Sequence, residues 1–331
     1  MPISYELRHH VLDSGGAISI DEAKYAEYGH AHEVLLNALY IEEKLDLLLE
    51  NFVEYEEALL SIGLSRMVFQ RNDWTEFRND ISMVNRRLVN LLSACRAYLD
   101  QLPHHINEIC DPSKNEAGIL RRAMTEQYNS VFGYRVMEAL RNYAQHRGSP
   151  FQSSDFSETC EWCGERQVKV FTVDPFLEPT RLSQDGEFKK AVLDEMSQRG
   201  EAVYLKPLVR QYISSIIEIH RQARDLVRDG VRQKRETIEF ALEAVRVRDA
   251  VEKDCVSAFI IIADDGACTG RVCLSLESER RREILCKRSL CLAGLDHHFV
   301  SGVCRDDGEN ERDGTQQNGR VDLLAGPSST R

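Results

Sequence analysis

The feature that most constrains the fold is a long run of apolar residues that repeat at alternating four- and three-residue intervals. The run begins near Asp21, continues to about Leu64 and contains no proline. This spacing places the apolar side chains along one side of an α-helix. The stripe consists of Val34, Ala38, Ile41, Leu45, Leu48, Phe52, Tyr55, Leu59 and Ile62. Neighbouring residues such as Leu35 and Leu49 widen it, which favours packing in a helical bundle over an isolated two-stranded coil.

Two more long helices are expected after the first. The second begins at Asp73, a good N-cap residue, and ends at Pro103. The third begins after Pro112 and ends before Gly148, because glycine and then proline commonly follow the end of a helix. Helices resume near residues 186, 205 and 231. The predicted fold class is therefore all-α, a bundle of long helices.

The remaining segments are expected to be peripheral to this bundle. Residues 1–20 form an N-terminal extension, and 21–250 form the bundle, with a short β insertion near 160–182 where apolar residues alternate. Residues 251–331 are expected to be poorly ordered, apart from a candidate strand at 255–263. Beyond about residue 305 the composition cannot support a core, which predicts a disordered tail.

Charge and composition narrow the range of functions. The chain has 331 residues, a formal net charge of −12 and 42% hydrophobic residues, so it can bury a large core. The acidic balance argues against a protein that coats nucleic acid regardless of sequence, because such proteins need a positive field. An enzyme that meets RNA at one pocket needs only local cations, and the net charge does not exclude it.

The ends and the cysteines bear on the compartment. The N-terminus has no basic region followed by an apolar core, as a signal peptide would have. The longest apolar run is too short to cross a bilayer, so we expect no membrane partner and a cytoplasmic location. The ten cysteines are scattered through the chain, which favours reduced thiols.

One short stretch, Arg141-Asn-Tyr-Ala-Gln-His146, lies at the end of the third predicted helix. The order of arginine, a polar residue and then histidine resembles the signature of the HEPN superfamily. The resemblance implies a compact helical domain that dimerises and acts as a metal-independent endoribonuclease, with no cofactor. It also implies a setting in toxin–antitoxin control or antiphage defence, with an antitoxin or regulatory protein as a further partner.

The chemistry of RNA cleavage explains why these residue types would be needed. Histidine is the side chain whose ordinary pKa lies nearest neutrality, so His146 is the candidate general acid or base. Arginine stays charged and offers a planar fork matched to phosphate, so Arg141 is the candidate transition-state clamp. Asn142 lies four residues before His146, on nearly the same helix face, and could orient either group.

Helix geometry separates the two catalytic candidates. Arg141 and His146 are five residues apart, so on a regular helix they point in directions that differ by roughly 140°. They converge only if the last turn unwinds, if the arginine wraps round the helix, or if two copies of the motif face each other in a dimer. A structural interpretation stays open, in which Arg141 pairs with an acidic neighbour such as Glu138 and His146 caps the helix end and bonds a carbonyl.

Three other features have alternative interpretations. Arg221, Arg224, Arg228 and Arg232 could hold RNA phosphates, or they could form a solvated helix face with Arg221–Asp225 and Asp229–Arg232 pairs. The Cys160 and Cys163 pair has the spacing of half a zinc site, but no second pair follows at the usual interval. The rival function is a non-catalytic protein-interaction or nucleotide- and RNA-binding module of HEPN-like fold, whose heptad stripe could dock a partner helix or join two subunits.

Overall fold

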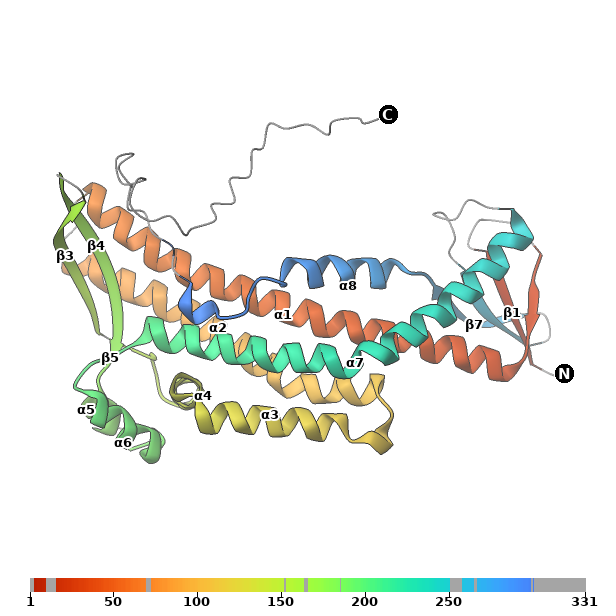
Figure 1. The fold of residues 1–331 in the computed structure, drawn as a ribbon, viewed down its shortest axis with the longest axis horizontal. Helices are drawn as coiled ribbons and strands as arrows, with labels where there is room; N and C mark the ends of the chain where they lie inside the picture. The colour runs from red at the N-terminus through yellow and green to blue at the C-terminus, as the bar shows by residue number, and fades with distance from the viewer. Residues whose placement is uncertain are drawn as a thin grey trace, which may run out of the picture.

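The structure is a computed structural model, and three long helices form its frame. It describes residues 3–9, 16–69, 73–151, 153–163, 166–184, 186–250, 258–264, 267–298 and 300. Helices α1 (Glu22–Phe69), α2 (Trp74–Ile109) and α7 (Leu205–Asp249) run side by side and give the molecule an elongated shape (Figure 1).

The predicted apolar stripes form the core between these helices. Of the nine stripe residues of α1, eight are buried, and Phe52 is partly buried against the others. The apolar stripe of α1 that could have docked a partner helix therefore packs against α2 and α7 of the same chain. Asp73 caps α2 as expected, since its side chain accepts a hydrogen bond from the Thr75 amide at 3.3 Å.

Two predicted helix interruptions do not occur. Helix α2 continues through Pro103 to Ile109, and α7 continues through Gly230. Proline removes one backbone hydrogen bond, but the burial of Leu102 and Ile106 on either side of it favours continuing the helix. A side chain at Gly230 would come within 3.4 Å of the Ile109 carbonyl oxygen, so the glycine lets α7 pass close to the end of α2.

The third predicted helix is instead two helices, α3 (Glu116–Ser130) and α4 (Phe132–His146), joined at the extended residue Val131. In Figure 1, α3 lies along the bundle while α4 is seen end-on. The break is stabilised by Arg135, whose Nη1 donates to the carbonyls of Tyr128 and Asn129 at 2.8 and 2.7 Å. These contacts satisfy groups that a helix end leaves unpaired.

Two small antiparallel sheets lie at opposite ends of the bundle (Figure 1). One contains β3 (Ser153–Cys163), β4 (Arg166–Leu177) and β5 (Val203–Tyr204), and its hairpin matches the predicted β insertion, although it begins earlier. The other has the order β2-β1-β6-β7, in which β1 pairs with both β2 and β6. Its strands are β1 (Ser4–His9), β2 (Ile18–Ile20), β6 (Ala258–Asp264) and β7 (Ala267–Leu274).

The second sheet and α8 (Glu277–Arg288) contain regular secondary structure in segments where the sequence predicts little of it. Strand β1 belongs to the predicted N-terminal extension. Strand β6 overlaps the candidate strand at 255–263, while β7 and α8 lie in the region expected to be poorly ordered. Pairing of β1 with β6 joins the β1–β2 pair and the β6–β7 pair into one four-stranded sheet, and a two-stranded pair alone is only marginally stable. The predicted tail beyond residue 305 lies outside the described residues.

The shorter elements complete the fold. They are the 3₁₀ turns Pro112–Lys114 and Leu295–His297 and the helices α5 (Pro179–Gln184) and α6 (Lys190–Arg199). Within the part of the chain that the structure describes, none of the helices has the length and apolar character that crossing a bilayer requires.

Candidate functional site

The predicted motif lies on the last two turns of α4. Asn142 and His146 are exposed, and Arg141 is half-buried. The Arg141 Nη1 atom donates to Asn142 Oδ1 at 2.9 Å, while its buried Nε has no hydrogen-bond partner among the described residues. Arg141 is therefore held against the asparagine next to it, with part of its donor capacity unused.

The helix does not unwind before the motif ends. Helix α4 continues through His146, and the Arg147 amide donates to the Tyr143 carbonyl at 2.9 Å to close the last turn. Arg141 and His146 therefore keep the different directions of a regular helix, whereas Asn142 and His146 share one side. Convergence of the arginine and the histidine then needs the long arginine side chain or a second copy of the chain.

The motif has no acidic partner within the described residues. Glu138, which could have paired with Arg141, instead accepts hydrogen bonds from Tyr212 at 2.6 Å and from Arg96 at 3.4 Å. No ion pair or hydrogen bond to a carbonyl engages the His146 ring among these residues. Glu138 is therefore not the partner that the structural interpretation suggested for Arg141.

Contacts on both sides of the motif fix α4 in place. On its inner face Val136, Met137 and Leu140 are fully buried in the core. After the motif the chain is anchored by Asn85 of α2, whose amide donates to the Phe151 carbonyl at 2.8 Å and accepts from the Phe151 amide at 3.2 Å. The exposed end of α4 is therefore rigidly presented at the surface.

The arginine stripe of α7 is engaged by carboxylates. Arg221 pairs with Glu218 at 2.8 Å rather than with Asp225, because Asp225 pairs with Arg228. Arg232 pairs with Asp229 at 2.9 Å, as expected. Arg224 points inward to the buried Glu42. The pairs of Arg221, Arg228 and Arg232 favour the interpretation of a solvated helix face over that of a phosphate-binding strip, whereas Arg224 belongs to the core.

Cys160 is exposed on β3, and the Cys163 side chain lies outside the described part of the chain. Within that part, no group of three or more histidine, cysteine and acidic side chains is arranged to hold a metal ion.

A buried polar network in the core was missed by the sequence analysis. Glu42 of α1 is only 3% exposed. Arg224 donates to both of its carboxylate oxygens, at 2.8 and 2.5 Å. His220 Nε2 lies 3.3 Å from Glu42 at an angle unsuited to a hydrogen bond, and Tyr98 Oη lies 2.7 Å from His220 Nδ1. A signal was present, because Glu42 stands four residues after Ala38 and three before Leu45 in the apolar stripe.

The network controls ionisation in the core. Burial alone would raise the pKa of Glu42, but the hydrogen bonds from Arg224, together with the adjacent His220 ring, more than offset this and lower the pKa to about 2. Burial lowers the pKa of His220, which opposes its protonation beside the ionised carboxylate. The network is thus a buried Glu42–Arg224 ion pair with a neutral histidine and tyrosine attached.

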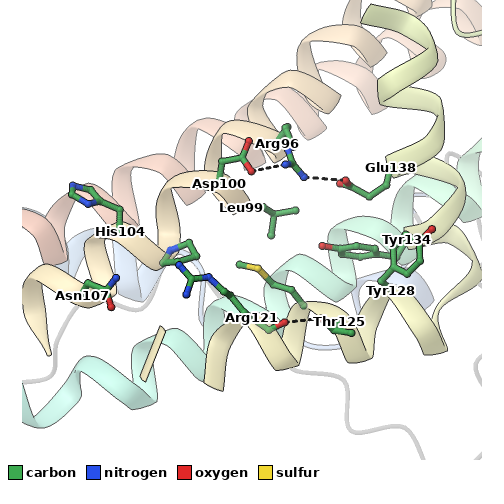
Figure 2. Close-up of a pocket in the computed structure, with 12 residues that line it drawn as sticks. Arg96, Leu99, Asp100, His104, Asn107, Arg121, Thr125, Tyr128, Tyr134 and Glu138 are labelled. Carbon is green, nitrogen blue, oxygen red and sulfur yellow. Dashed lines mark hydrogen bonds and ion pairs between the residues drawn. The ribbon is translucent and has the colours of Figure 1, made fainter. Parts of the chain in front are cut away.

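A cleft of about 670 Å³ opens between α2, α3 and α4 (Figure 2). Its polar residues include Arg96, which bridges Asp100 at 2.7 Å and Glu138 at 3.4 Å. Glu138 is also one turn before Asn142 on α4, so the cleft and the motif share this helix. The lining residues are Arg96, Leu99, Asp100, Pro103, His104, Asn107, Arg121, Met124, Thr125, Tyr128, Tyr134 and Glu138.

The described residues define a mainly α-helical protein in which long helices pack as a bundle and carry two small antiparallel sheets. Comparison with protein-family models, curated proteins and solved structures finds no match for this chain.

Proposed function

We propose that this chain is a HEPN-like endoribonuclease that cuts RNA without a metal ion, at a site built from Arg141, Asn142 and His146. The observation that carries the proposal is the state of these side chains at the end of α4. Asn142 and His146 are exposed on one side of the helix, and neither Arg141 nor His146 has an ion-pair partner within the described residues. Asn142 and His146 are therefore accessible to a phosphodiester, and the charge of Arg141 is not balanced by a described carboxylate.

The proposed reaction needs proton transfers and charge neutralisation only. The 2′-hydroxyl of the RNA loses its proton and attacks the adjacent phosphorus, and the bond to the 5′ oxygen breaks. A neutral imidazole takes the first proton, and an imidazolium gives a proton to the leaving oxygen. The products are a 2′,3′-cyclic phosphate and a 5′-hydroxyl. Arg141 neutralises the charge that builds on the phosphoryl oxygens.

A homodimer forms part of the proposal. Since α4 stays helical to His146, one chain presents its arginine and histidine in different directions. Two copies facing each other at this helix end would bring Arg141 of one copy toward His146 of the other. We further propose a cytoplasmic role in toxin–antitoxin control or antiphage defence, with an antitoxin or regulator as partner.

The test uses the full-length protein and mixed RNA in excess chelator. We expect cleavage that leaves 2′,3′-cyclic phosphate ends and that is lost in His146→Ala and in Arg141→Ala. Matched controls are His30→Ala and Arg86→Ala, which change exposed side chains on α1 and α2, and they should keep full activity. Circular dichroism checks that all variants fold. Intact RNA with the wild-type protein, or equal cleavage by the His146→Ala variant, contradicts the proposal.

One observation favours the rival function of a protein-interaction module. Near its end, α1 exposes Leu60, Leu64 and Val68, with exposed fractions of 53%, 58% and 57%. These residues follow one another at four-residue intervals, so they share one side of the helix. If the wild-type protein leaves all RNA intact while Leu64→Glu abolishes association with a partner protein, the interaction module is the better description.

A further inference from the structure

The cleft between α2, α3 and α4 combines an apolar floor with charged walls. Its volume of about 670 Å³ falls within the usual range for small-molecule sites. Leu99, Pro103 and Met124 supply apolar surface, and the rings of Tyr128 and Tyr134 meet edge to face with centroids 6.4 Å apart. This combination suits a ligand with a flat or compact apolar body.

The two arginines of the cleft are in different states. Arg96 is bound by Asp100 and Glu138, so two carboxylates balance its charge. Arg121 is exposed, and no described carboxylate pairs with it. Figure 2 shows Arg121 reaching from α3 toward α2 along the cleft. Arg121 is therefore the cation available to a ligand.

The formal charge of the lining limits which anions fit. Two arginines face one aspartate and one glutamate, so the cleft is neutral overall when His104 is neutral. A ligand with several negative charges would be repelled by Asp100 and Glu138 once it had engaged Arg121. A ligand with a single anionic group avoids most of this repulsion.

The walls of the cleft are fixed before any ligand binds. Arg96 joins α2 to α4 through Glu138, and Glu138 accepts a further hydrogen bond from Tyr212 of α7 at 2.6 Å. On α3, the Thr125 hydroxyl donates to the Arg121 carbonyl at 2.9 Å. A preformed site loses less free energy to ordering when a ligand enters.

We propose that this cleft binds a small amphipathic carboxylate, with its apolar body against Leu99, Met124 and Tyr128 and its carboxylate group on Arg121. The contacts that support the site involve none of Arg141, Asn142 and His146, so the inference does not depend on the proposed ribonuclease function. A phosphate monoester is mostly a dianion at neutral pH, so the charge of the lining favours a carboxylate over it.

The binding test is calorimetric titration of the full-length protein. The probe is 3-phenylpropanoate, with the neutral alcohol 3-phenylpropanol, the dianion phenyl phosphate and the polyanion ATP for comparison. We expect saturable binding of 3-phenylpropanoate below about 1 mM, and weaker binding of the alcohol, of phenyl phosphate and of ATP. No saturable binding of 3-phenylpropanoate, or equal binding of the alcohol, overturns the proposal.

Substitutions at Arg121 and Thr125 test whether the ligand binds in the cleft. Arg121→Gln should weaken binding at least about tenfold, because it removes a charge-assisted hydrogen bond. The matched control is Arg122→Gln, the neighbouring exposed arginine, which should bind as the wild type does. Thr125→Trp should fill the cleft from an exposed position and block binding, while Glu126→Trp, at an exposed position of α3 outside the cleft lining, should leave binding unchanged. Unchanged affinity in both Arg121→Gln and Thr125→Trp overturns the assignment.

Discussion

Tyr98 of α2 and His220 of α7 meet inside the core, where the tyrosine Oη atom lies 2.7 Å from Nδ1 of the histidine. This contact joins helices whose residues are far apart in the sequence. Through Glu42 and Arg224 the same network reaches α1, and Arg224 Nη2 donates to the Ser289 hydroxyl at 2.6 Å, just beyond the end of α8. A polar network thus fixes how four helices pack.

The Glu42–Arg224 pair gives the first prediction. Arg224→Met should lower the free energy of unfolding by about 3–5 kcal/mol, because it leaves the Glu42 carboxylate buried without its main partner. The double variant Glu42→Gln/Arg224→Met should recover part of this loss. Urea unfolding measures both. The control Arg228→Met removes an exposed pair and should change stability by less than about 1 kcal/mol. Similar effects of Arg224→Met and Arg228→Met would contradict the prediction.

Acidification should destabilise the fold in two stages. Burial lowers the pKa values of His32, His105 and His220, with that of His105 falling to about 4. The unfolded chain therefore binds protons near the ordinary pKa of 6.5 that the folded chain does not bind, and stability decreases as the pH falls below about 6.5. Glu42 has its pKa lowered from 4.5 to about 2, so its contribution is present above pH 4.5 and is lost as the pH falls toward 2.

Unfolding in urea at several pH values tests whether stability is lost in these two stages. We expect a plateau above about pH 7, a decline below about 6.5 and a steeper decline below about 4.5. The variant His105→Gln should flatten the first decline, since it removes one of the three histidines. A free energy of unfolding that stays constant between pH 7 and pH 5 would show that these histidines titrate alike in both states.

Asn85 should contribute to the stability of the fold, because it anchors the chain that follows the motif. Its amide makes two hydrogen bonds with the backbone of Phe151, and both residues are buried. Asn85→Ala should cost about 1–3 kcal/mol, because it leaves the Phe151 amide and carbonyl without partners. Thermal or urea unfolding measures the loss, and Asn90→Ala, an exposed change on the same helix, is the control. Equal stability of the Asn85→Ala and Asn90→Ala variants would contradict the prediction.

Replacing either of two glycines by alanine should change the free energy of unfolding, in opposite directions at the two positions. At Gly133 a Cβ atom would lie 2.7 Å from Gln211 Cβ and 2.8 Å from the Leu208 carbonyl oxygen, so α4 could no longer pack closely on α7. Gly133→Ala should therefore destabilise the protein by about 1–3 kcal/mol. Gly29 is helical and has nothing within 4 Å of such an atom, and Gly29→Ala should stabilise by up to about 1 kcal/mol. The same sign for both variants in unfolding experiments would contradict this account.

The long helices and their buried faces could be predicted from the sequence. Apolar spacing depends only on the helical repeat, so Val34, Leu48 and Tyr55 were assigned to the core correctly. The predicted motif also lies at a helix end, because Gly148 follows α4. The break at Val131 was missed. Arg135 pairs with Glu195, and the Gly133 amide donates to the Gln211 side chain, so the contacts that stabilise the break involve residues that are distant in the sequence.

The sequence by itself determined the helical class, the face that each long helix buries and the position of Arg141, Asn142 and His146 along the chain. The tertiary structure decided which charges are balanced. In the folded protein Glu42 is buried and pairs with Arg224, Glu138 accepts from Arg96 and Tyr212, and residues of three helices line the cleft. The physical reason is that helical periodicity is a local property, whereas ion pairing and cavity shape depend on side chains brought together from distant segments.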